Sequence, residues 1–321
     1  MVPFKGSLDM KQYIRNKPTK WGVKIFVLCG ESGTMFDFLI YQGSTTEVKS
    51  EYTQFGLGAA VVMQLSERLP QFFQIYFDNF FSTYPLFQWL IKKEIYAVGT
   101  IRVDRFCKPP LKTDSEMKKL PRGSVDEVVS KDEIILTKWS DNSCVTLGSN
   151  FIGKGEFDTC RRWDKKQNRY IDVPRPQCVQ LYNASMGGVD KLDFLVALYR
   201  TFIRSKKWTL RMFTHALDLA VTNSWLEYRK ESARQQVPSK EMMDLIHFRQ
   251  YVSEALIVGG RQPTKKRGRP SSTEEATTAP LHHKRVAAIK PVMEVRYDGM
   301  HHLPEVSEKE WQDRCMNEGC T

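Results

Sequence analysis

Apolar and polar positions near the start of the chain predict two neighbouring strands followed by a helix. Residues 21–29 alternate and then become apolar, and residues 35–41 repeat the strand pattern after a polar turn at residues 31–34. Both stretches are rich in β-branched and aromatic residues, which favour strands. In residues 58–69 the apolar side chains recur at helical spacing, and Pro70 ends that stretch. The pattern predicts strand, turn, strand and helix in this order.

A strand–helix–strand unit comes next. The apolar run at residues 73–77 predicts a short buried strand, residues 85–93 a helix and residues 96–101 a second strand. Asp78 ends the first strand at its carboxyl end, where open α/β sheets place their ligands and chemistry. A turn residue or a helix N-cap is the alternative interpretation of Asp78.

The character of the chain changes between residues 103 and 176. Prolines, glycines and many charges predict loops there. Two short strands are expected at residues 133–139 and 145–149, joined by a hairpin turn at residues 140–143. Taken alone, this segment is typical of any small β module.

Two helices are predicted after this segment. The pair Gly187-Gly188 opens the first, on which Asp190 and Asp193 lie three residues apart on one face. The second is long and amphipathic, and we expect its apolar side to pack in the core. That side comprises Leu210, Phe213, Leu217, Ala220, Val221 and Tyr228.

A basic stretch lies between these helices. No acidic residue occurs from Arg200 to Met212, and Phe202 and Trp208 are interleaved with the cations. Such a patch can hold phosphates, whereas a solvated helix edge is the alternative. The candidate DNA-binding residues are Arg204, Lys206, Lys207 and Arg211.

Composition adds a partner class and removes others. The net charge of +11 suggests a polyanionic partner, most often nucleic acid, with a merely basic protein as the alternative. Seven scattered cysteines do not form a secreted disulfide framework. Five of them have no metal-ligand spacing, so we interpret these as reduced thiols of an intracellular protein: Cys29, Cys107, Cys144, Cys160 and Cys178. No apolar run approaches membrane-spanning length and no signal peptide opens the chain, so no membrane partner is expected.

The last part of the chain is predicted to be a flexible basic linker. It contains Lys265-Lys266-Arg267-Gly268-Arg269-Pro270, in which Arg267 and Arg269 are typical of an AT-hook that enters the minor groove. The same residues are typical of a nuclear-localisation signal, which we place first, with minor-groove contact second and no role third. At the end, Cys315 and Cys320 supply two of the four ligands that a structural zinc site needs, so no Zn²⁺ is expected there.

Several of these stretches resemble the piggyBac transposase family. They are Phe73-Gln74-Ile75-Tyr76-Phe77-Asp78-Asn79-Phe80-Phe81-Ser82-Thr83, Tyr182-Asn183-Ala184-Ser185-Met186-Gly187-Gly188-Val189-Asp190-Lys191-Leu192-Asp193, Met1–Asn16 and Lys17–Lys24. The resemblance covers Met1 to about Val258. It implies an α/β fold with a ribonuclease-H-like (DDD transposase/integrase) core, a β-rich insertion and a following α-helical part.

The resemblance also implies domain boundaries. The core would comprise residues 1–102 and 177–199 with its first strand incomplete, and the insertion residues 103–176. Residues 200–258 would form the helical dimerisation and DNA-binding part, and residues 259–308 the basic linker. Residues 309–321 would begin a truncated cysteine-rich tail.

The family's site residues can be carried over in part. The second catalytic Asp falls on Asp78, the third on Asp190 and a further acid on Asp193, and these would hold Mg²⁺. The first catalytic Asp falls just before the position of Met1. We therefore expect an incomplete metal site.

Three functional hypotheses follow from this reasoning. The first is a domesticated nuclear protein that binds double-stranded DNA and is catalytically inactive. The second is an incomplete stretch of an active Mg²⁺-dependent cut-and-paste transposase that inserts at TTAA. The third is a scaffold that does not bind DNA. A homodimer is left open, and no small-molecule substrate is expected.

Overall fold

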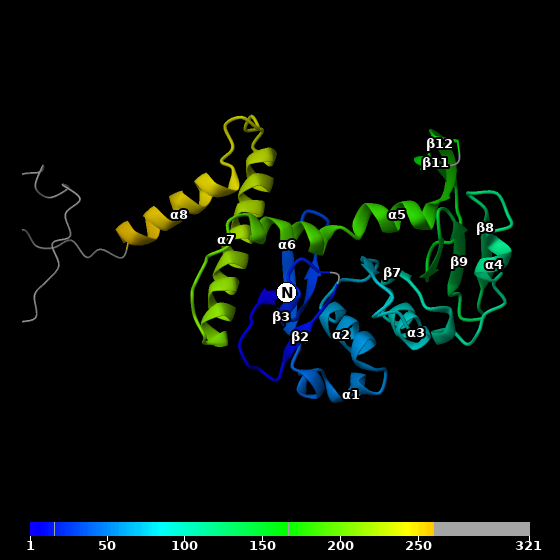
Figure 1. Cartoon of the computed structure of the whole chain (residues 1–321), viewed down its shortest axis with the longest axis horizontal. Coiled ribbons are helices and arrows are strands. Elements are labelled where there is room, and N and C mark those ends of the chain that lie inside the picture. Colours follow the sequence, from blue (N-terminus) through cyan, green and yellow to red (C-terminus); the bar gives the residue numbers. More distant parts are fainter. Residues whose placement is uncertain (16, 166, 260–321) are drawn as a thin grey trace, which may run out of the picture. The chain divides into compact units, whose positions relative to one another are not determined.

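The computed structural model describes residues 1–15, 17–165 and 167–259 (Figure 1). The first three strands form an antiparallel sheet in the order β1-β3-β2, and the next two pair with each other. Residues 21–29, which were predicted to form one strand, form two strands separated by Lys24. Their bounds are β1 (Val2–Pro3), β2 (Lys11–Tyr13), β3 (Trp21–Val23), β4 (Ile25–Cys29) and β5 (Met35–Ile40).

Helix α2 (Leu57–Ser66) lies where the helix was predicted and packs on two groups of strands. Val61 and Leu65 form a core with Phe26 of β4. Ala59, Ala60 and Met63 instead join a core with the next strands, which includes Ile75 and Phe77. The short helix α1 (Ser50–Thr53) and the 3-10 turn Gly43–Thr45 precede α2.

The predicted strand–helix–strand unit is confirmed as β6 (Gln74–Phe77), α3 (Tyr84–Lys92) and β7 (Tyr96–Thr100), with β6 parallel to β7. Phe73 was predicted to lie in the buried strand, but it precedes β6 and is exposed. At Gly99, a Cβ atom would lie 2.5 Å from the Phe77 ring, so the close approach of the two strands requires glycine.

The following strands continue the same sheet. Its order is β6-β7-β10-β9-β8, because β10 pairs antiparallel with β7. The two strands predicted in this region are confirmed as β9 (Ile135–Ser140) and β10 (Cys144–Ser149), and β8 (Val125–Val129) lies beside β9. The 3-10 turn Val103–Arg105 and helix α4 (Asp114–Met117) lead into β8. The sequence did not predict the separate antiparallel ribbon β11 (Phe157–Asp164) and β12 (Arg169–Pro176).

Four helices complete the described chain: α5 (Gln177–Ser185), α6 (Gly188–Leu198), α7 (Trp208–Arg234) and α8 (Leu245–Gly259). Leu192 and Val196 of α6 pack with Leu219 of α7 against residues around β4. Figure 1 shows α5 and α6 as consecutive helices, with α7 crossing α6. No described helix is long and apolar enough to cross a membrane.

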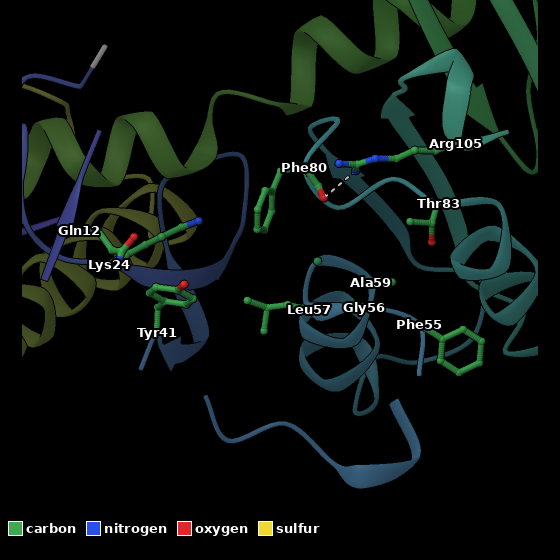
Figure 2. A pocket seen from close by; sticks show the side chains of 11 residues that line it. Gln12, Lys24, Tyr41, Phe55, Gly56, Leu57, Ala59, Phe80, Thr83 and Arg105 are labelled. Atoms are coloured by element: carbon green, nitrogen blue, oxygen red, sulfur yellow. Dashed lines mark hydrogen bonds between the residues drawn. The ribbon is translucent and has the colours of Figure 1, made fainter. Parts of the chain in front are cut away.

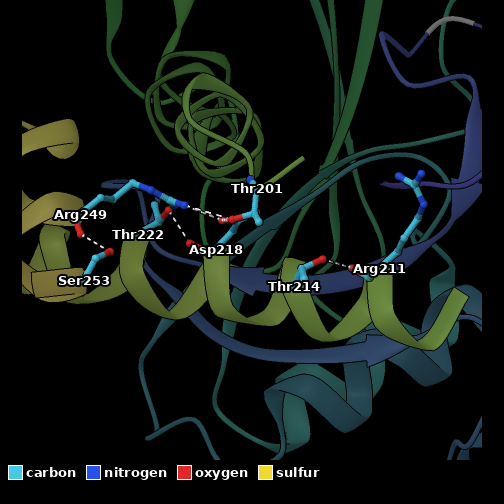
Figure 3. Close-up of polar contacts among 7 residues, drawn as sticks. All are labelled: Thr201, Arg211, Thr214, Asp218, Thr222, Arg249 and Ser253. Carbon is cyan, nitrogen blue, oxygen red and sulfur yellow. Dashed lines mark hydrogen bonds and ion pairs between the residues drawn. The ribbon is translucent and has the colours of Figure 1, made fainter. Parts of the chain in front are cut away.

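The apolar side of α7 corrects a prediction. Phe213 and Leu217 are 62% and 51% exposed, and Leu210 is exposed as well, although this side was expected in the core. Polar residues face inward instead, because Asp218 accepts hydrogen bonds from Thr201 and Arg249 (Figure 3). Val221 and Tyr228, further along the predicted side, do pack in the core between α7 and α8.

Candidate functional site

Asp78 occupies the turn that follows β6. Its Oδ1 accepts a hydrogen bond from the Phe80 backbone N–H at 2.8 Å, and its carbonyl accepts one from the Ser82 hydroxyl at 3.2 Å. The hydroxyl of Ser82, which is fully buried, also reaches the Thr100 carbonyl at 2.6 Å. Thr83, not Asp78, caps α3. Asp78 therefore has the turn role that was its alternative interpretation, and its carboxylate still lies exposed at the strand end.

The negative charge of Asp78 affects the pKa values of two residues from distant segments. Burial lowers the pKa of Lys24 below its usual value, and the negative charge of Asp78 opposes this shift. Burial also raises the pKa of Tyr182 on α5, and Asp78 adds to the rise while a hydrogen bond with Thr100 opposes it. The structure thus brings β6, α5 and the junction of β3 with β4 together around Asp78.

A pocket of about 440 Å³ lies beside this turn (Figure 2). Lys24 and Phe80 line it together with Arg105, whose guanidinium donates a 2.9 Å hydrogen bond to the Asn79 carbonyl. Leu57 and Ala59 at the start of α2 form part of the wall, and no side chain caps this helix end. Cationic side chains and free helix N–H groups suit an anionic group such as a phosphate.

The second pair of acids lies at the start of α6. A Cβ atom on Gly188 would lie 2.4 Å from the Gly30 carbonyl, so glycine lets α6 begin directly against the end of β4. The contact is secured by Lys191, whose Nζ donates to the Glu31 carbonyl at 2.7 Å. Asp190 and Asp193 are on this helix as predicted.

Each acid of α6 faces a cation. Lys17 Nζ lies 3.3 Å from Asp190 Oδ1, and the amino group of Met1 lies 3.8 Å from Asp193 Oδ1. The described residues contain no group of three His, Cys, Asp or Glu side chains that could hold a metal ion. The assignment of Asp78, Asp190 and Asp193 as Mg²⁺ ligands stays a prediction.

The basic stretch is open to solvent. Arg204, Lys206 and Lys207 are exposed, and Arg211 is half-buried with its Nε donating to the Ser205 carbonyl at 3.2 Å. Phe202 is 80% exposed. In the described part of the chain, none of these four cations forms an ion pair.

Lys17 and Lys24 are the neighbours of the acids that sequence reasoning missed as site residues. Lys17 is 173 positions from Asp190, so no local pattern could have paired them. The predicted residues Arg267, Arg269, Cys315 and Cys320 lie outside the described residues.

Comparisons with known proteins agree on one family. A family model described as Transposase IS4 matches residues 1–225. Human piggyBac transposable element-derived protein 3 is 31% identical over 98% of this chain and 49% of its own length. Human piggyBac transposable element-derived protein 2 is 30% identical over 84% of this chain and 45% of its own length. The chain spans about half the length of these relatives.

A solved structure shares the fold. It is a cryo-EM structure of a piggyBac transposase synaptic complex with hairpin DNA, matched with a TM-score of 0.61 and 22% identity over 82% of this chain and 53% of that chain. This likeness confirms the predicted fold class, an α/β ribonuclease-H-like core. The proposed domain boundaries stay predictions.

Proposed function

Because the chain belongs to the piggyBac transposase family, we propose that residues 1–321 form a nuclear DNA-binding protein that does not cut DNA. The partner is double-stranded DNA, held mainly through its phosphates. A homodimer is compatible with this function and is not required by it.

The exposed basic stretch carries the proposal. Arg204, Lys206 and Lys207 are free of acidic partners within the described chain, so their charges are available to phosphates. Each phosphate that such a cation neutralises releases counterions and steepens the salt dependence of binding. The net charge of +11 adds long-range attraction. A solvated edge without a partner would need no such concentration of unpaired cations.

The proposed lack of DNA cleavage rests on the surroundings of Asp78 and Asp190. In two-metal strand transfer, carboxylates must gather around both ions. Here Asp78 lies in its turn, while Asp190 contacts Lys17. The described residues bring no third carboxylate to either acid.

Salt-dependent binding to duplex DNA tests the DNA-binding proposal. The triple substitution Arg204→Gln, Lys206→Gln and Lys207→Gln should flatten the slope of log K against log salt by up to about 0.9 per cation. A matched control replaces Lys230 and Arg234, exposed cations of α7 that already pair with Glu227 and Glu231. A triple variant with the wild-type slope would overturn the proposal.

Nuclear import is assigned to the basic segment beyond the described residues. In a fluorescent fusion, Arg267→Ala with Arg269→Ala should move the protein to the cytoplasm. The same variant should bind A/T-rich duplexes more weakly, because arginine is attracted to their narrow minor groove. Equal losses on A/T-rich and G/C-rich DNA would leave the segment with the import role alone.

One observation favours a second candidate, an active cut-and-paste transposase that inserts at TTAA. Both Asp78 and Asp190 are exposed at the end of a strand and the start of a helix, where an added carboxylate could meet them. A nicking assay on family-type terminal repeats with Mn²⁺ separates the two candidates. Metal-dependent nicking by residues 1–321 that is lost in Asp78→Ala would support the transposase.

A further inference from the structure

The β11–β12 ribbon has an anchored end and a free end. At the anchored end, Cys160 and Val173 are buried in a core with Trp139. The indole Nε1 of Trp139 donates a hydrogen bond to the Pro174 carbonyl at 2.9 Å. None of the described residues between 161 and 170 belongs to that core. The free end is therefore a two-stranded element with an uncovered outer face.

Aromatic side chains gather on this outer face. Trp163 and Tyr170 are direct cross-strand partners, with ring centroids 5.0 Å apart and ring planes at 71°. They are 43% and 57% exposed, and the Arg161 guanidinium lies 4.7 Å from the centre of the Tyr170 ring. Such a pair stabilises a ribbon by itself, so the aromatic rings alone do not indicate a ligand.

The charges around the two aromatic rings, in contrast, do indicate a ligand. Residues 161–170 contain five basic side chains and one acidic side chain. Arg162 shares the carboxylate of Asp141 with Arg122, so two arginines are balanced by one acid. Within the described chain, no ion pair joins Arg161, Lys165 or Arg169 to an acid. Exposed rings flanked by unpaired cations match the needs of a nucleic-acid strand, in which bases alternate with phosphates.

We infer that the free end of the β11–β12 ribbon binds an unpaired stretch of DNA. A base stacks on Trp163 and Tyr170, while Arg161, Lys165 and Arg169 contact the flanking phosphates. An unpaired strand fits better than a duplex, because ring faces reach bases only outside the duplex stack. This inference rests on the proposed DNA binding and adds a second surface, separate in sequence from the basic stretch at residues 204–211.

Binding of the full chain to labelled oligothymidine and to a duplex tests the inference. Trp163→Ala should weaken oligothymidine binding about tenfold, the effect of one lost stacking contact, and leave duplex binding unchanged. Trp163→Tyr should restore binding because it keeps a ring. Phe157→Ala is the matched control, since Phe157 is 50% exposed on the same face but lies at the anchored end of the ribbon.

Photocrosslinking supplies a readout of position. A strand carrying 5-iodouracil should crosslink to residues 161–170 in the wild type and in the triple variant of residues 204, 206 and 207. Wild-type oligothymidine binding by Trp163→Ala, or crosslinks only elsewhere, would overturn the ribbon site while duplex binding still supports the proposed function. If the wild-type chain bound neither oligothymidine nor the duplex, both the ribbon site and the proposed function would be overturned.

Discussion

Two neighbouring glycines at the start of α6 differ in the space around them. A Cβ atom on Gly188 would meet the Gly30 carbonyl at 2.4 Å, whereas nothing lies within 4 Å of one on Gly187. Gly188→Ala should therefore destabilise the fold by about 1–3 kcal/mol, the usual cost of overpacking. Gly187→Ala should change stability by less than about 0.5 kcal/mol. Urea unfolding of both variants measures the difference, and equal costs would contradict this packing of α6 on β4.

His215 makes stability depend on pH. Its pKa is lowered from 6.5 to about 4, mainly by burial and in smaller part by the positive charges of the chain's amino group and Arg200, while Asp193 and Asp218 oppose the shift. Between pH 6.5 and pH 4 the histidine is therefore protonated in the unfolded state but neutral in the folded state. The stability that His215 contributes is complete above pH 6.5 and falls as the pH drops towards 4. The contribution lost at pH 5 is about 2 kcal/mol.

His215→Leu, which cannot be protonated, isolates this contribution. Its unfolding free energy should fall less than that of the wild type between pH 7 and pH 5. Urea titrations at the two pH values measure this difference. Parallel losses in the two proteins would show that His215 is not buried in its neutral form.

At the scale of elements, local periodicity predicted those that depend on near neighbours. The β6–α3–β7 unit follows from residues 73–101 alone, because its apolar run, helical spacing and second strand are contiguous. The β11–β12 ribbon was missed because β12 contains Pro174 and Pro176 and because its outer face is charged and aromatic without regular alternation. Sequence reasoning also placed the first half of the predicted apolar side of α7 in the core, where the structure has it exposed. In that half Asp218 faces inward because it pairs with Thr201 and Arg249, residues that no local pattern links to it.

The orientation of α7 can be tested within the helix. Phe213→Ala should cost less than about 0.5 kcal/mol, because the ring is already largely exposed. Leu219→Ala should cost about 2–5 kcal/mol, because Leu219 is buried against α6. Thermal or urea unfolding of the two variants checks this. A large loss at Phe213 would mean that its side chain is covered in the protein.

At the scale of the whole molecule, we expect the acids of the candidate site to bind a metal ion only weakly, because no group of three His, Cys, Asp or Glu side chains lies together among the described residues. Calorimetric titration of residues 1–321 with Mg²⁺ or Mn²⁺ should show no site tighter than about 1 mM, because water would fill most of the ion's shell. Asp190→Ala should leave this result unchanged. A micromolar site abolished by Asp190→Ala would contradict it.

The candidate site was predictable in parts. The sequence placed Asp78 at a strand end and Asp190 on a helix, since both positions follow from adjacent residues. It could not place Lys24 beside Asp78 or Lys17 beside Asp190, because those approaches are made only when distant segments pack.

One pair of hydrogen bonds between distant segments limits when the start of β5 can complete its contacts during synthesis. Asn223 on α7 receives a hydrogen bond from the Met35 amide at 3.0 Å and returns one to the Met35 carbonyl at 2.8 Å, across 188 positions. During synthesis at about 5–20 residues per second, the start of β5 therefore waits about 10–40 s for this partner. Until then the hairpin β4–β5 can pack on α2 but lacks α6 and α7, which cover Val27, Cys29 and Met35, so these side chains are open to chaperones. Closing so long a loop also slows refolding, so the nascent chain is more vulnerable than the finished one.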